Sequence, residues 1–260
     1  MIRIAYICAD QGVPVFGRKG CSIHVQEVLR SFRRHGVQLE LFATRLEGDP
    51  PPGLETIRIH RLPTPPDGAR AVREQAALAA NHDLRAALER AGPFELVYER
   101  YSLWSFAGMD YARARGVPGL LEVNAPLIDE QAEYRDLVDR TSAEQVAECV
   151  LGAATVLIAV SQEMAAYLAR YPSARGRTQV IPNGVNPERF PAGLQPSCPG
   201  PPGTFTVGFV GGLKPWHGLP TLVEAFVLLH CSVPNTRLLI VGEGPARESL
   251  VEDLLARRCP

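Results

Sequence analysis

Short apolar runs alternate with helix-patterned segments from the first residues of the chain. Residues 2–9, IRIAYICA, form a continuous apolar run, which is typical of a strand covered on both faces of its sheet. After a loop, residues 22–36 place apolar side chains at helical spacing and end on Gly36, a residue suited to the position after a helix. Repeated strand–helix alternation predicts an α/β fold, a Rossmann-like, doubly wound parallel sheet.

The alternation continues to about residue 190. Further strands are expected at 37–43, 56–62, 95–99, 119–123 and 155–160, and helices at 69–91, 104–115 and 129–151, with a short helix capped by Ser161. Residues 191–203 are rich in proline and glycine and carry no apolar periodicity, which is typical of a connection between domains. A second, shorter series follows, with strands expected at 205–210 and 237–242 and helices at 219–231 and 246–258.

Two domains are therefore expected. Residues 1–190 form the first, 191–203 the linker, and 204–260 an incomplete second domain. These last 57 residues hold only two strand–helix units, whereas a doubly wound domain normally needs upwards of roughly 100 residues to close a core.

Composition excludes several classes of protein. A formal charge of −1 and a pI near 6.6 provide no net field for nucleic acid or an acidic membrane. No apolar run reaches the length of a membrane span, and the N-terminus lacks the pattern of a signal peptide. The six cysteines show no CxxC spacing, and the histidines do not cluster with metal-ligand spacing. We expect a cytoplasmic protein without a metal or a disulfide framework.

The first candidate site is GRKGCSIHVQ, residues 17–26. It lies between the first strand and the first helix, where a doubly wound fold opens its ligand crevice. Gly20 lets the backbone approach a ligand closely, the free amides at the start of the helix can bind an anion, and His24 can donate a hydrogen bond or take up a proton. The alternative is a flexible loop with His24 exposed to solvent.

The second candidate is GFVGGLKPWHG, residues 208–218. Its backbone N–H groups could hold a phosphate, while Lys214 supplies a positive charge. The alternative is a surface loop in which Trp216 covers the crevice between the domains. A later stretch, VGEGPARESL, has only a GxG and an arginine where a third glycine belongs, so it is weak support for a dinucleotide site.

Polar residues also follow or end two of the expected strands. Glu99 and Arg100 stand at one, and Glu122 and Asn124 at the other. A carboxylate or amide at these points could orient a sugar hydroxyl. Internal hydrogen bonding that caps loops is the alternative, and it applies to Glu99 and Arg100 in particular.

Together these stretches resemble family 4 glycosyltransferases of the GT-B fold, over nearly the whole chain. The resemblance is carried, in order, by CADQGVPVFGRKGCSIHVQEVLRSFRRHG, LVYERYSLWSFAG, LLEVNAPL, VIPNGVNPERF, GFVGGLKPWHGLPTLVEAF and LLIVGEGP. It implies a retaining, hexosyl-type transfer from a nucleotide-sugar donor to a glycan, lipid-linked or small-molecule acceptor. No metal and no cofactor are implied, since the donor is a substrate, and peripheral membrane association is left open.

These observations assign roles to residues. A catalytic role is expected for His24, from its place in the first helical turn, and for Asn124, which the resemblance places beside the reacting sugar. Glu122, a carboxylate at a strand end, and Gly20, onto which the family's first glycine loop maps, are expected to bind substrate. The family's second glycine loop maps onto a group that would bind the pyrophosphate: Gly211, Gly212, Lys214, His217 and Gly218.

The sequence departs from the family pattern at four points. Gly212 and His217 stand where the family commonly has Arg and Lys, so Lys214 is expected to supply the missing charge. Asn124 stands where many members have histidine. The family's later pair of glutamates, separated by seven residues, is absent after Gly218. We therefore expect a C-terminally truncated enzyme with little activity. A non-catalytic acceptor- or partner-binding module and a nucleotide-sugar epimerase of the same architecture are the alternatives.

Overall fold

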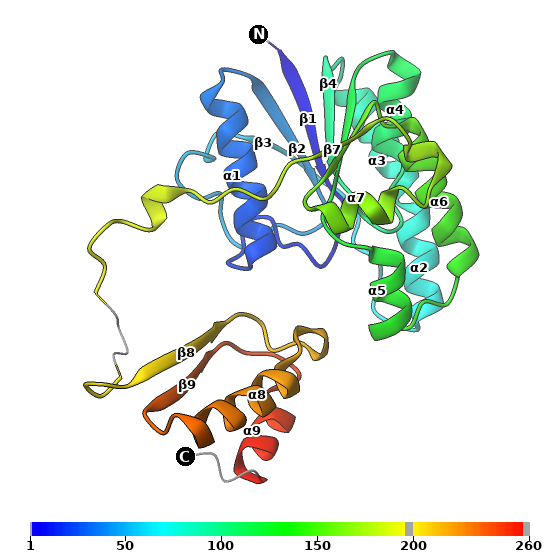
Figure 1. Ribbon diagram of the computed structural model, residues 1–260. Helices are drawn as coiled ribbons and strands as arrows, with labels where there is room; N and C mark the ends of the chain where they lie inside the picture. The colour runs from blue at the N-terminus through cyan, green and yellow to red at the C-terminus, as the bar shows by residue number, and fades with distance from the viewer. Residues whose placement is uncertain (1, 196–199, 257–260) are drawn as a thin grey trace. The chain divides into compact units, whose positions relative to one another are not determined.

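The chain divides into two compact units, Met1–Pro187 and Glu188–Pro260. A computed structural model describes residues 2–195 and 200–256 (Figure 1). The division falls close to the boundary expected at residue 190. Residues 196–199 of the expected linker, and the end of the helix expected to reach residue 258, lie outside the described residues.

The first unit contains a parallel sheet of seven strands in the order β3-β2-β1-β4-β5-β6-β7. Their bounds are β1 Arg3–Cys8, β2 Gln38–Ala43, β3 Arg58–Arg61, β4 Leu96–Arg100, β5 Gly119–Val123, β6 Val156–Ala159 and β7 Thr178–Val180. The chain builds outward from β1 to β3, then returns to the other side of β1 with β4. The connection after β1 therefore runs to one side of the β1–β4 pair, and the connection after β4 runs to the other. The point between β1 and β4 is the topological switch point, where such sheets bind ligands.

Helices cover both faces of this sheet (Figure 1). On one face, Val25 and Leu29 of α1 (Gly20–Arg34) pack in a core with Ile4, Tyr6 and Cys8 of β1. The alternate residues of β1 face a second core, to which helices α3 (Asn81–Ala91), α4 (Ala107–Arg115), α6 (Arg140–Ala153) and α7 (Gln162–Leu168) contribute. Successive side chains of β1 thus enter opposite cores, which explains why the strand is apolar throughout.

The helix expected over 69–91 is instead two helices, α2 (Arg70–Ala79) and α3. Asn81 accounts for the break, because its amide nitrogen donates to the carbonyl oxygens of Leu78 and Trp104 at 2.9 and 2.8 Å. Its side-chain oxygen accepts from the backbone N–H groups of Phe106 and Ala107. Asn81 thereby satisfies free amides at the start of α4, a partner far along the chain that helical periodicity could not reveal.

The helix expected over 129–151 is also two helices, α5 (Leu127–Tyr134) and α6. Between them Asp136 has a positive φ of 58°, and Asp139 caps α6 by accepting from the backbone N–H of Ser142 at 2.9 Å. Two other expectations are confirmed. Gly36 follows α1 with φ 72°, and Ser161 caps α7 through the backbone N–H of Met164.

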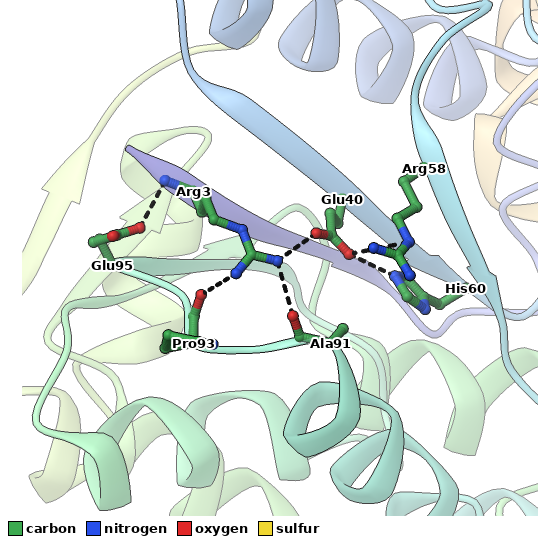
Figure 2. Close-up of polar contacts among 7 residues, drawn as sticks. All are labelled: Arg3, Glu40, Arg58, His60, Ala91, Pro93 and Glu95. Atoms are coloured by element: carbon green, nitrogen blue, oxygen red, sulfur yellow. Dashed lines mark hydrogen bonds and ion pairs between the residues drawn. The ribbon is translucent and has the colours of Figure 1, made fainter. Parts of the chain in front are cut away.

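A buried ionic cluster joins the first three strands near the amino end of β1 (Figure 2). Glu40, 1% exposed, accepts from Arg3 at 2.6 Å and contacts His60 at 2.7 Å. Burial would raise the pKa of Glu40, but the hydrogen bonds from Arg3 and His60 outweigh it and lower that pKa. Arg3 also donates to the carbonyl oxygens of Ala91 and Pro93, so the cluster ties β1 and β2 to the segment before β4.

The second unit contains a two-stranded parallel sheet of β8 (Phe205–Val210) and β9 (Thr236–Val241), with helices α8 (Leu219–Ser232) and α9 (Arg247–Ala256). Its buried apolar residues are few: Leu213, Leu219, Val223, Phe226 and Leu250. Several of its large apolar side chains are exposed, including Phe205 at 68% and Val210 at 81%. The expected strands and helices are present, on a sheet of two strands in the part of the chain that the structure describes.

No described helix has both the length and the apolar character needed to cross a membrane. Among the described cysteines, Cys8 is buried, Cys149 and Cys231 are exposed, and none forms a disulfide.

Candidate active site

The candidate residues of the first unit lie at the carboxyl ends of its central strands. Arg100 ends β4 and is paired in register with Glu122 of β5. Side chains alternate between the two faces of a sheet, so Tyr98 and Arg100 share a face with Glu122, and Glu99 points to the other. This is the face that α1 covers, and α1 carries His24.

Glu122 gathers the polar side chains of this edge. Its side chain is 3% exposed, and Oε1 lies 2.9 Å from Nε2 of His24 and 3.2 Å from Nη1 of Arg100. The amide of Asn124 donates to the same oxygen, and the hydroxyl of Tyr98 donates to Oε2. The structure therefore brings His24, Glu122 and Asn124, three residues singled out from the sequence, into one hydrogen-bonded group. We name these residues, with Tyr98 and Arg100, the Glu122 cluster.

The cluster keeps its carboxylate ionised despite burial. Burial alone would raise the pKa of Glu122, but hydrogen bonds from His24, Asn124 and Tyr98, together with the charge of His24, lower it to about 2. An ionised Glu122 fixes the orientation of the His24 ring and of the Asn124 amide. Glu122 thus holds both candidate catalytic groups in place, and proton transfer to or from a substrate requires side chains positioned in this way.

Tyr98 was not singled out from the sequence. Its ring stacks on Tyr6 with 5.1 Å between centroids, and burial followed by the charge of Glu122 raises its pKa far above the ordinary value. Tyr98 stays a neutral donor to the carboxylate. The available signal was its spacing of two residues before Arg100, which places both side chains on one face.

Glu99 lies outside the cluster, on the opposite face. It is fully buried and accepts from the hydroxyl of Ser105, and a Cβ added at Gly108 of α4 would meet its Oε2 at 2.3 Å. Burial raises the pKa of Glu99 to about 7, although the Ser105 hydroxyl and the Met109 backbone N–H act to lower it. Glu99 therefore follows the alternative interpretation, in which its side chain makes an internal hydrogen bond. Arg100 does not, because it joins the Glu122 cluster.

Gly20 is the first residue of α1, two residues earlier than the expected start of the helix at residue 22. The helix has no side-chain cap and no acidic residue in its first turn, and Ile23 makes the first backbone bond, to Lys19. The amides of Gly20, Cys21 and Ser22 are therefore the ones left for an anion. A Cβ built at Gly20 meets no atom within 4 Å, so no neighbouring side chain or backbone atom of the described residues requires glycine there.

A cavity of about 640 Å³ opens at the same edge of the sheet, at the switch point. Its walls come from segments that follow four strands, at 9–12, 44–45, 62–65 and 102–105, and from parts of α2, α3 and α5. This volume suits a sugar-sized ligand. The residues of the Glu122 cluster are not among its walls.

In the second unit, the glycine loop leads from β8 into α8. Gly211 and Gly212 follow β8, and Gly218 adopts the left-handed conformation, φ 64°, immediately before α8. His217 contacts the carbonyl oxygen of Gly212 through Nδ1, and Nζ of Lys214 lies 5.9 Å from the ring of Trp216. Lys214 is half-buried beside the loop, and α8 has no acidic residue in its first turn and no side-chain cap. The loop thus has the geometry of an anion-binding helix start.

The GEG sequence after β9 has a structural role that its spacing did not reveal. A Cβ at Gly242 would meet the carbonyl oxygen of Gly211 at 1.8 Å, and one at Gly244 would meet that of Leu213 at 2.3 Å. Backbone bonds join the two loops from Leu213 to Glu243 and from Ala246 to Leu213, at 2.9 and 3.1 Å. These glycines let the loop after β9 support the glycine loop after β8.

Within residues 2–195 and 200–256, no group of three or more His, Cys, Asp or Glu side chains could hold a metal ion.

Comparison with known proteins gives a consistent result. The family model "Glycosyltransferase Family 4" matches residues 18–189. A curated relative, D-inositol 3-phosphate glycosyltransferase 1 of Catenulispora acidiphila, is 26% identical over 243 residues, which are 88% of this chain and 58% of the relative. The chain thus spans a little under three fifths of that relative's length.

Solved structures show the same fold. Sucrose-phosphate synthase from Thermosynechococcus elongatus superposes with a TM-score of 0.70 at 21% identity, over 99% of this chain and 68% of that one. Anabaena HepE in complex with UDP and glucose gives a TM-score of 0.67 at 16% identity, over 99% and 67%. These likenesses confirm the predicted α/β fold of GT-B type.

Proposed function

The chain belongs to glycosyltransferase family 4, and from this premise we propose that it serves the transfer of a sugar from a nucleotide-sugar donor to an acceptor hydroxyl with retention of configuration. The transferred group is a hexosyl unit. The acceptor is a glycan, a lipid-linked sugar or a small molecule, and the reaction needs no metal.

The observation that carries this proposal is the Glu122 cluster. Glu122 holds His24 and Asn124 at the carboxyl edge of the sheet, inside the segment that matches the family model. His24 at this edge can donate to an oxygen of the reacting sugar, and Asn124 supplies an amide where many family members have histidine. Glu122 acts through both as a positioning residue.

The glycine loop of the second unit supports a nucleoside diphosphate donor. Gly212 and Gly218 leave backbone N–H groups accessible next to the ammonium group of Lys214, and these groups and a positive charge are suited to a diphosphate. The N–H of Gly211 donates to the carbonyl oxygen of Val241 at 3.0 Å and holds the loop in place instead. UDP is the nucleotide present in the HepE structure. His217 contributes through its bond to Gly212, which holds the loop closed on itself.

We propose further that the 260-residue chain alone has negligible transferase activity. No pair of glutamates with the family spacing follows Gly218 in this sequence, and that pair would hold the donor sugar and ribose.

Nucleotide-sugar turnover tests the proposal. The 260-residue protein is compared with a chimera that continues into the corresponding C-terminal segment of the Catenulispora relative. Both receive UDP-glucose with and without a panel of acceptors, and NMR reads the anomeric configuration of the product. We expect retained-configuration product from the chimera only, with a rate that falls at least tenfold in Glu122→Gln.

The two alternatives give different results. A binding module would bind acceptor, and its chimera would leave the donor unchanged. An epimerase would isomerise the donor without any acceptor. Inverted product would contradict the retaining mechanism.

A further inference from the structure

The cavity at the switch point carries an excess of positive charge. Four arginines and two carboxylates line it. The two carboxylates are Asp10 and Glu74, and both are already bonded to backbone amides. Glu74 accepts from the N–H groups of Val138 and Asp139 at 3.1 and 2.9 Å, and Asp10 accepts from Gly12 at 2.7 Å.

Two of the arginines are not neutralised by these carboxylates. Within the described residues, Arg70 forms no hydrogen bond or ion pair through its side chain, and Arg73 reaches only the side-chain oxygen of Gln11, at 3.4 Å. A third, Arg45, pairs with Glu47 at 2.8 Å, but both side chains are about half exposed, so that pair is weak. Half-buried guanidinium groups without a carboxylate partner are suited to an anionic ligand.

Backbone amides at the start of α2 add to the positive potential in the cavity. Arg70 and Arg73 lie three residues apart in the first turn of α2, so they share one side of the helix. That turn has no acidic residue and no side-chain cap, which leaves its first amides for an anion. Beside them, the side-chain nitrogen of Gln11 is buried and has no hydrogen-bond partner. A buried donor without a partner costs free energy that a bound oxygen would recover.

We propose that this cavity binds an acceptor that carries a phosphate monoester, with Arg70 and Arg73 on the phosphate and Gln11 donating to one of its oxygens. This rests on the proposed function and names its acceptor class. A dianionic phosphate matches two unpaired guanidinium groups better than a neutral hydroxyl group does. The volume leaves room for a sugar or polyol attached to that phosphate.

Binding to the 260-residue protein tests the proposal independently of catalysis. Calorimetry measures the dissociation constants of glucose 1-phosphate, glucose 6-phosphate and D-inositol 3-phosphate, each beside its unphosphorylated parent. At least one phosphate should bind tenfold or more tightly than its parent. Arg70→Gln and Arg73→Gln should each weaken that phosphate by about tenfold or more, because a hydrogen bond to a charged group is lost.

Arg90→Gln is the matched control, since it removes the same charge from the end of α3, outside the cavity. It should change the affinity less than twofold. Melting temperatures check that each variant folds, and Arg45→Gln, on a surface loop, is a second variant for which an intermediate loss is expected.

Four results would overturn the proposal. These are equal binding of every phosphate and its parent, equal losses in Arg70→Gln and Arg90→Gln, inorganic phosphate binding as tightly as the sugar phosphates, or displacement of the phosphate by UDP in direct competition. The proposed transfer reaction fails on a different result, the absence of product from the chimera, so the two failures are distinguishable.

Discussion

At the scale of single residues, Glu122 organises the carboxyl edge of the sheet. One buried carboxylate contacts His24 of α1, Tyr98 and Arg100 of β4, and Asn124 in the segment after β5. Removing the negative charge of Glu122 should lower stability, because its hydrogen-bond donors lose their acceptor. It should also lower activity, because His24 and Asn124 are no longer held in position.

Replacing Glu122 with Gln should reduce the loss of stability in acid. The folded pKa of about 2 lies below the ordinary 4.5, so the carboxylate contributes stability that is present above pH 4.5 and lost as the pH falls toward 2. The difference corresponds to about 3 kcal/mol. Urea unfolding at pH 7 and pH 3 measures it. The variant should be less stable at pH 7 and approach the parent at pH 3, and parallel curves would contradict the cluster geometry.

Gly20→Val should lower transfer by the chimera and leave its melting temperature nearly unchanged. The site has space for a Cβ, so the fold tolerates the side chain, but a β-branched group would stand where a ligand approaches the amides of α1. A large fall in melting temperature with normal donor binding would assign Gly20 a structural role instead.

Lys214→Ala should weaken UDP binding by the chimera. One ammonium–phosphate contact in a partly screened loop is worth roughly 1–3 kcal/mol, or about fivefold to 150-fold in affinity. Calorimetry decides, and unchanged affinity would place the diphosphate away from this loop.

At the scale of elements, close approach between loops decides where glycine is needed. The loop after β9 passes so near the loop after β8 that Gly242 and Gly244 have no room for a side chain. Gly208, in the middle of β8, has no atom within 4 Å of an added Cβ. The backbone of the neighbouring loop thus requires glycine at 242 and 244, whereas no neighbouring atom requires it at 208.

Gly244→Ala should destabilise the second unit by about 1–3 kcal/mol, because its methyl group would overlap the backbone of Leu213. Gly208→Ala is the control and should have little effect or stabilise β8. Hydrogen exchange of the β8 and β9 amides measures both in the chimera, where the second unit continues into the relative's C-terminal segment. Equal protection in the two variants would show that the loops separate without cost.

At the scale of the whole molecule, the two units differ in how much apolar surface they bury. Two cores cover both faces of the seven-stranded sheet, whereas the second unit buries few apolar residues and exposes Phe205 and Val210. Ordering each residue costs on the order of 1–2 kcal/mol in backbone entropy. The second unit offsets less of that cost.

Hydrogen exchange on the 260-residue protein should therefore be slow in β1, β2, β4, β5 and β6 and fast in β8 and β9. An exposed two-stranded sheet also presents unpaired edges, so a rise in aggregation with concentration is expected. Protection of β8 and β9 equal to that of β1 in a monomer would contradict this account. Turnover of a nucleotide sugar by that monomer would also contradict the negligible activity proposed for the 260-residue chain.

The class of fold and the position of most elements could be predicted from the sequence, because the periods of strands and helices are local and are visible along the chain. The strand at 205–210 and the cap at Ser161 were predicted in this way. The break at Asn81 was not, since its partners lie more than twenty residues away. The catalytic role of His24 came from its position in the first helical turn and that of Asn124 from the resemblance, and both stay predictions.

The contact of His24 with Glu122, 98 residues later, and the position of Glu99 away from them follow from the packing of distant segments. Packing of α1 on one face of the sheet makes the first contact, and the alternation of β4 prevents the second. The charged cavity is likewise a product of tertiary structure. Arg70 and Arg73 are ordinary surface residues in the sequence, and they become a site because the sheet brings the loops after four strands together around them.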